Sequence, residues 1–107
     1  MAFECSIPAV ATLLRDDADV RVVRWDFAPG AATGWHRHAW VYFVVMLSDA
    51  LMRVHDGERV TEIARTAGET YQRPAGVQHD VMNGSKDTPM AFVEIELKRP
   101  AALASPA

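Results

Sequence analysis

The chain has 107 residues, half of them hydrophobic, and a net charge of −3, which fits one packed domain and excludes a largely disordered chain. The acidic balance and the absence of a Lys/Arg cluster argue against a nucleic-acid partner, and no apolar run approaches the length that crosses a membrane. A single cysteine, Cys5, excludes an intrachain disulfide, and the first residues lack the basic region of a signal peptide, so we expect a soluble, cytoplasmic protein.

The first part of the chain predicts short β-strands rather than helices. Residues 1–19 form an N-terminal arm whose pattern fits either a strand or a helical turn, and a polar break closes it. Residues 20–27 then alternate apolar with polar side chains, which is typical of a half-buried strand. One slip in this alternation, at Val22–Val23, suggests a β-bulge.

The rest of the chain continues the strand pattern. Residues 41–47 are apolar throughout, which predicts a strand buried on both faces, with one face needing cover from the arm or from a second subunit. A hairpin turn is expected at Asp56–Gly57. Further strands are expected at residues 51–55, 58–64, 70–73, 78–82 and 90–97, and a frayed tail at residues 100–107. Many short strands with regular turns predict an all-β sandwich or barrel over residues 20–99.

The spacing of three histidines predicts that they are metal ligands. His36 and His38 are two residues apart, so their side chains share one face of an extended strand. His79 follows the tight turn at residues 74–76, which fixes where its strand begins. Neutral imidazoles held by rigid elements are the ligands of transition-metal sites. His55, beside the predicted hairpin turn, is interpreted as a surface residue.

The surroundings of these histidines resemble two motifs of the cupin family. The first half of cupin motif 1 is similar to the segment that begins at Gly30 and continues, after five residues, with His36-Arg37-His38. The fixed positions of cupin motif 2 match a second segment at the same spacings: Gly68, five residues, Pro74-Ala75-Gly76, two residues, His79, three residues and Asn83. Segments 28–38, 73–83 and 92–98 most resemble the small BauB-like cupins of beta-alanine degradation. This resemblance implies a double-stranded β-helix, the cupin jelly-roll barrel, with a metal ion held inside by the three histidines.

One position departs from the family. Cupin motif 1 has a glutamate three or four residues after its second histidine, where this chain has Tyr42 and Phe43. The usual acidic ligand is therefore missing, and a three-histidine site follows. Three neutral ligands leave the charge of the ion uncompensated, which favours an anionic co-ligand from a small organic substrate. Among cupins this pattern resembles iron-dependent thiol and diketone dioxygenases, and by geometry alone it equally resembles a zinc site that activates water.

Other polar side chains have two interpretations each. Tyr42 is either a hydrogen-bond donor to a metal-bound substrate, and so a catalytic residue, or a core tyrosine with its hydroxyl at the rim. One of Gln72 and Arg73 alternates inward, and Gln72 is expected to reach the pocket. Glu94 and Glu96 share a face of the last strand, where they either supply an acid near the site or face solvent, and we interpret them as solvent-facing. Asn83 is interpreted as a turn residue that satisfies backbone groups.

These observations leave three functional hypotheses. The first is a non-haem dioxygenase that uses Fe(II) on a small anionic organic molecule. The second is a non-redox metal enzyme, an isomerase or hydrolase using Zn, Ni or Mn. The third is a small-ligand binding or sensing cupin without catalysis, favoured by the lack of a confident acid or base near the motifs. In each case we expect a homodimer, since exchange of the N-terminal arms would cover the apolar strand at residues 41–47.

Overall fold

The computed structural model describes Phe3 and residues 6–99, and in this part of the chain it contains eleven β-strands and no helix. Within it, therefore, no helix is long and apolar enough to cross a membrane. The strands are β1 (Ile7–Pro8), β2 (Val10–Asp16), β3 (Val20–Phe27), β4 (Ala31–Ala32), β5 (His36–Arg37), β6 (Val41–Met46), β7 (Ala50–His55), β8 (Val60–Arg65), β9 (Thr70–Arg73), β10 (Gln78–Asn83) and β11 (Met90–Leu97). Strands expected from the sequence lie within two residues of these bounds. Cys5 and the tail expected at residues 100–107 lie outside the described residues.

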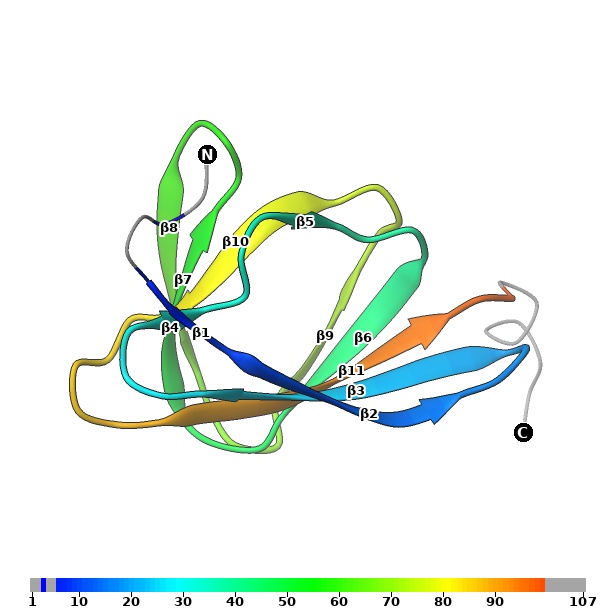
Figure 1. Cartoon of the computed structure of the whole chain (residues 1–107), viewed down its shortest axis with the longest axis horizontal. Helices are drawn as coiled ribbons and strands as arrows, with labels where there is room; N and C mark the ends of the chain where they lie inside the picture. Colours follow the sequence, from blue (N-terminus) through cyan, green and yellow to red (C-terminus); the bar gives the residue numbers. More distant parts are fainter. Residues whose placement is uncertain (1–2, 4–5, 100–107) are drawn as a thin grey trace.

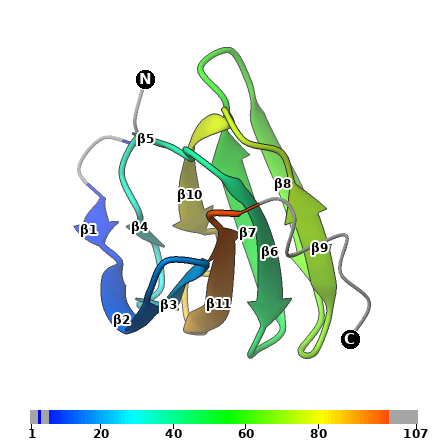
Figure 2. The same cartoon turned by 90° about the vertical axis from the view of Figure 1, so that its right-hand side faces the viewer.

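The strands form two sheets that face each other. One sheet has the order β1-β4-β10-β7-β8, with β5 paired to β10, and the other has the order β2-β3-β11-β6-β9. Figures 1 and 2 show the two sheets and the β7–β8 hairpin, which projects at one end. This arrangement confirms the predicted all-β fold, a double-stranded β-helix.

The N-terminal arm is extended where the structure describes it. β1 pairs in parallel with β4, and β2 pairs antiparallel with β3, at the edge of its sheet. A β-bulge does lie opposite Val22 and Val23, where one was predicted, but its extra residue, Leu14, belongs to β2 and not to β3. β3 itself pairs with β11 without interruption, so its buried side chains all reach the same interior.

β6 runs through the centre of the second sheet, between β11 and β9. Tyr42, Val44 and Met46 point into the barrel and are almost completely buried. Their neighbours at residues 41, 43 and 45 are only half-buried, because alternation turns them to the outer face of the sheet. The prediction that residues 41–47 are buried on both faces is therefore wrong for the outer face.

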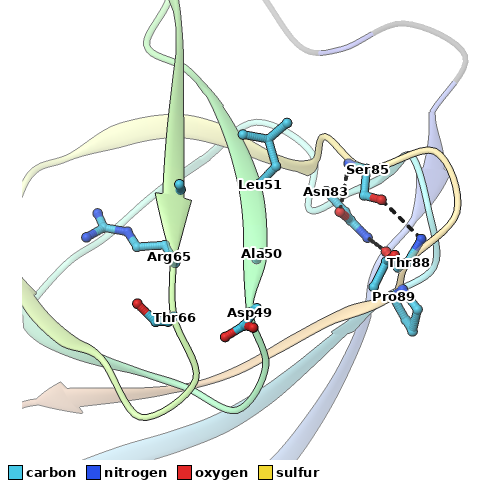
Figure 3. A pocket seen from close by; sticks show the side chains of 10 residues that line it. Asp49, Ala50, Leu51, Arg65, Thr66, Asn83, Ser85, Thr88 and Pro89 are labelled. Carbon is cyan, nitrogen blue, oxygen red and sulfur yellow. Dashed lines mark hydrogen bonds between the residues drawn. The ribbon is translucent and has the colours of Figure 1, made fainter.

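Asn83 closes the barrel interior at the end of β10. Its amide Nδ2 donates to the carbonyl of Thr88 at 2.8 Å and, at 3.4 Å each, to those of Phe27 and Ala28, while its Oδ1 accepts from the N–H of Ser85. Figure 3 shows the hydrogen bonds of Asn83 to Thr88 and Ser85 beside a cavity of about 460 Å³ at the opposite end of β10 from His79. Asn83 thus satisfies backbone groups, as predicted.

Candidate metal centre

The three histidines meet because motif 1 and motif 2 are hydrogen-bonded to each other. His36 on β5 and His79 on β10 are direct partners across an antiparallel pair, so their side chains share one face. His38 lies just beyond β5, where its N–H donates to the carbonyl of Val77 and its carbonyl accepts from the N–H of Gly76. The turn that was expected to position His79 therefore positions His38 as well.

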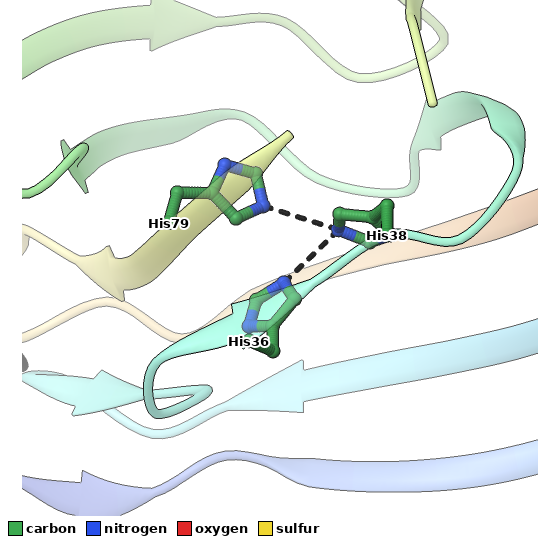
Figure 4. Close-up of side chains that lie close together, drawn as sticks. All are labelled: His36, His38 and His79. Atoms are coloured by element: carbon green, nitrogen blue, oxygen red, sulfur yellow. Dashed lines mark hydrogen bonds between the residues drawn. The ribbon is translucent and has the colours of Figure 1, made fainter. Parts of the chain in front are cut away.

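The Nε2 atoms of the three imidazoles converge. Nε2 of His38 lies 3.0 Å from Nε2 of His36 and 3.1 Å from Nε2 of His79, as Figure 4 shows. One ligand nitrogen from each histidine lies within 4.8 Å of the other two. Zinc and similar first-row ions bind imidazole nitrogen at about 2.0–2.1 Å, so nitrogens this close together can reach one ion. The donor set therefore fits a transition metal.

The second nitrogen of His36 fixes its tautomer. Nδ1 of His36 lies 2.8 Å from the carbonyl oxygen of Gly34, which can only accept a hydrogen bond. The Nδ1–H therefore donates to this carbonyl, and Nε2 keeps the lone pair that a metal needs. Thr33 Oγ1 lies 3.2 Å from the same nitrogen and supports the ring from the other side.

The surroundings of the histidines favour the neutral form of two of them. Burial lowers the pKa of His36. Burial also lowers the pKa of His79 to about 3, and the nearby charges of His36, His38 and Arg73 act in the same direction. Neutral imidazole is the form that binds a metal, so His36 and His79 are prepared as ligands near neutral pH.

Two acidic side chains lie next to the site, contrary to the sequence interpretation. Glu94 and Glu96 are only 8% and 9% exposed, because β11 is an internal strand and its even-numbered residues face the barrel interior. The solvent-facing interpretation is wrong. Glu96 Oε2 lies 3.9 Å from Nδ1 of His38, and burial raises the pKa of Glu94 to about 7. The alternation that puts Phe92 on the same face as both acids was the signal that could have placed them inside.

The position of Glu96 bears on the missing motif-1 carboxylate. Glu96 approaches His38 from the Nδ1 side, away from the converging Nε2 atoms. Among the described residues, only the three histidines bring ligand atoms together at this point. At 3.9 Å Glu96 makes no hydrogen bond to His38, so this carboxylate can balance charge behind the ring without being a ligand.

Tyr42 lies deep in the core beside His38. The two rings stack, with centroids 3.9 Å apart and an interplanar angle of 23°. The Tyr42 hydroxyl is buried and has no hydrogen-bond partner among the described residues. Burial, assisted by the charge of Glu94, raises the pKa of Tyr42, so the phenol stays protonated. The hydroxyl is therefore a buried proton donor on the strand pair that Tyr42 shares with Arg73, and it is not at the rim.

Gln72 is not where the sequence placed it. On β9, Gln72 pairs with Phe43 on the outer face and is exposed, whereas Arg73 pairs with Tyr42 on the inner face. Arg73 lines a cavity with His79, and Gln72 does not. The expected pocket role of Gln72 is wrong, because the strand alternates in the opposite phase and Arg73 is the inward residue.

His55 lies apart from the three ligands. Its Nδ1 accepts from the N–H of Gly57, and its ring makes edge contacts with those of Phe3 and Trp35. The loop after it contains four residues, 56–59, and not the two expected from Asp56–Gly57. The histidine is half-buried, so it is less exposed than the surface role predicted.

Comparisons with known proteins agree with this geometry. The family model described as the cupin domain matches residues 23–96. The chain belongs to the cupin family. It is 44% identical over 90 residues to the beta-alanine degradation protein BauB of Pseudomonas aeruginosa, which covers 84% of the chain and 94% of that protein. The predicted resemblance to the BauB-like cupins is thereby confirmed.

Solved structures show the same cupin fold. A cupin domain from Bordetella pertussis Tohama I superposes with a TM-score of 0.82 at 41% identity, covering 86% of this chain and 95% of that one. A protein from Thermus thermophilus superposes with a TM-score of 0.65 at 24% identity, covering 87% of this chain and 86% of that one. The second likeness shows the fold alone.

Proposed function

We propose that this cupin is a metal-dependent enzyme, and that its chemistry is an Fe(II)-dependent dioxygenation of a small anionic organic molecule. The observation that carries the proposal is the convergence of three histidine Nε2 atoms without an acidic ligand among the described residues. A wholly neutral donor set favours an anionic substrate group as the next ligand. The name of the Pseudomonas relative, a beta-alanine degradation protein, supports a small organic acid as the class of substrate.

Each residue has a proposed part in this function. His36, His38 and His79 would hold the ion, and iron bound there would supply the redox chemistry that dioxygen requires. Glu96, whose Oε2 lies 3.9 Å from Nδ1 of His38, would balance the charge of the ion from behind this ring. Tyr42, whose hydroxyl has no partner among the described residues, would donate a hydrogen bond to the substrate and keep it in place beside His38.

The structure changes the weight of the rival hypotheses. The sensing hypothesis relied on the absence of an acid or base near the motifs, and Glu94 and Glu96 now lie beside His38. A catalytic role is therefore better supported than a purely binding one. The non-redox alternative, with Zn, Ni or Mn, uses the same three ligands and differs only in the metal and the reaction.

Metal analysis followed by oxygen uptake separates these hypotheses. Protein purified without chelators is expected to carry about one first-row metal per chain and, when loaded with Fe(II), to consume dioxygen with a small carboxylate, thiol or diketone. Zinc-loaded protein serves as the control and should consume none. Native zinc, nickel or manganese with no oxygen uptake in the iron form would favour the isomerase or hydrolase. Failure to bind any metal after reconstitution would refute the proposal.

We also propose that the protein is a homodimer. β1 and β2 present large apolar side chains to solvent, namely Ile7, Val10, Leu13 and Leu14, each more than half exposed. β2 is moreover an edge strand, with one side free to pair. An apolar edge of this kind is costly in water, and a second copy would cover it.

A further inference from the structure

Two cavities of different character flank the three histidines. The first, the His79 cavity, has a volume of about 160 Å³ and is bordered by His79, Arg73 and Arg65. The second, about 360 Å³, is bordered by His36 and His38 and contains the two buried acids Glu94 and Glu96. Arg21 and Arg37 also line the second cavity, and Arg21 lies 3.7 Å from Glu96, so the charges there are mixed. The His79 cavity contains Arg73, which has no acidic partner among the described residues, and we consider it as the receptor for an anion.

Arg73 is the available cation in the His79 cavity. It lies on the inner face of β9, directly opposite Tyr42 on β6, and it is exposed to solvent where it borders the cavity. No acidic side chain among the described residues lies within ion-pair distance of its guanidinium. Arg73 lines the same cavity as His79, so a ligand that it holds would lie beside that histidine. An arginine that borders a cavity and has no acidic partner is suited to bind a carboxylate through two hydrogen bonds.

The other charged groups of this cavity already have partners. Arg65 forms an ion pair with Glu69 at 2.6 Å, and its guanidinium lies 3.9 Å from the centre of the Tyr71 ring. Asp56 accepts hydrogen bonds from two backbone N–H groups in the β7–β8 loop. Arg65 and Asp56 are therefore held in place, and Arg73 remains as the group that can respond to a ligand.

The size and walls of the His79 cavity limit the ligand. Its volume equals that of roughly five water molecules in the liquid, well below the usual range of drug-sized pockets. The cavity has apolar walls, which are formed by Met52, Val54, Ile63 and Val81. The cavity therefore suits a short aliphatic body with a charge at one end.

We propose that Arg73 binds the carboxylate of a short aliphatic acid whose body fills the His79 cavity and whose other end is turned towards the three histidine nitrogens. The inference rests on the proposed function, because it assigns the position of that enzyme's substrate. It makes Arg73 the residue that selects acids over neutral analogues, and it places the ligand in a cavity that neither Glu94 nor Glu96 lines.

Binding of propanoate and propanamide to zinc-loaded protein, followed by NMR, tests this inference without requiring turnover. The two probes have nearly the same size and differ in charge. Wild-type protein is expected to bind propanoate at least about tenfold more tightly, the effect of one charge-assisted hydrogen bond. Arg73→Gln should remove this preference, and Arg73→Lys should restore part of it. The NMR spectra of both variants also report whether the fold is intact.

Two matched variants control for charge and for location. Arg59→Gln removes an exposed charge from the β7–β8 loop, outside both cavities, and should leave the preference unchanged. Arg37→Gln removes a charge that lines the second cavity and should also leave it unchanged. If the preference for propanoate survives Arg73→Gln, the carboxylate binds zinc directly and the inference is overturned. Loss of this preference with Arg37→Gln would also overturn it. Loss of the preference with Arg73→Gln, together with no oxygen uptake by the iron form, would refute the dioxygenase and keep the carboxylate site.

Discussion

His36 and His79 are direct cross-strand partners, and their rings lie 4.7 Å apart although the residues belong to different motifs. The pairing of β5 with β10 brings these two ligands together before any metal is considered. His38 then completes the set through its backbone hydrogen bonds to the turn that precedes β10. The metal centre is thus a property of the strand register.

Removing His79 should empty the site. We expect His79→Ala to carry less than about a tenth of the wild-type metal content, because two remaining imidazoles bind a first-row ion far more weakly. Elemental analysis of the purified proteins measures this. His55→Ala is the matched control, since His55 lies outside the cluster, and it should retain full metal content. Equal metal in both variants would contradict the site.

Glu96 should tune the metal affinity without being a ligand. Glu96→Gln keeps the size of the side chain and removes the charge behind His38. Loss of such a carboxylate typically weakens metal binding about 10- to 100-fold, and competition with a chromogenic chelator measures it. Glu58→Gln, an exposed change in the β7–β8 loop, controls for net charge. An unchanged affinity would show that Glu96 has no part in balancing the charge of the ion.

Glu94 should make the stability of the metal-free protein depend on pH. Its pKa is raised from 4.5 to about 7 in the folded protein, so the unfolded chain releases this proton first as the pH rises. The contribution of Glu94 to the free energy of unfolding is therefore fully present below about pH 4.5 and declines until about pH 7. Glu94→Gln should remove this decline, so that at pH 8 the variant is more stable relative to wild type than at pH 4.5, by on the order of 2 kcal/mol. Urea denaturation of both proteins at the two pH values tests this prediction. The same difference in unfolding free energy between variant and wild type at both pH values would contradict it.

Asn83 should be important for stability and not for metal chemistry. It is almost completely buried and satisfies three carbonyl groups and one N–H. Asn83→Ala would leave these groups unpaired, and we expect a loss of about 2–4 kcal/mol in the free energy of unfolding. Thermal and urea denaturation measure the loss. Replacing the exposed Gln78 by alanine should change stability by less than about 0.5 kcal/mol.

The proposed dimer should depend on the apolar edge formed by β1 and β2. Leu13→Glu places a charge on that edge and should shift the protein to a monomer in light scattering coupled to size exclusion. Thr61→Glu, an exposed change on β8, should leave the oligomeric state unchanged. A wild-type protein that is monomeric at high concentration would refute the dimer.

The sequence predicted the fold and the clustering of the three histidines because both depend on local patterns. Turn residues and strand alternation mark the elements, and the spacing of His36, His38 and His79 follows two compact motifs. The inner environment was harder to predict, since it depends on which face of each strand the barrel buries. Glu94 and Glu96 have the polarity of surface residues and are buried by the position of β11 between β3 and β6.

The phase of a short strand was equally hard to predict. β9 has only four residues, too few for alternation to show which side faces the interior. Its pairing with β6 determines the orientation of each residue. Arg73 pairs with Tyr42 and shares its inner face, and Gln72 pairs with Phe43 and shares its outer face. Such a choice depends on a register between distant segments, which one strand's own sequence does not contain.

The pairing between the motifs has a consequence for folding. His38 and His79 are separated by 41 positions along the chain, so their Nε2 atoms approach only when β5 and β10 are joined. An ion bound there would join the first half of the already closed barrel to the second, like a crosslink that a chelator can remove. Metal binding would then add to the stability of the folded chain, by an amount that rises with the concentration of free metal.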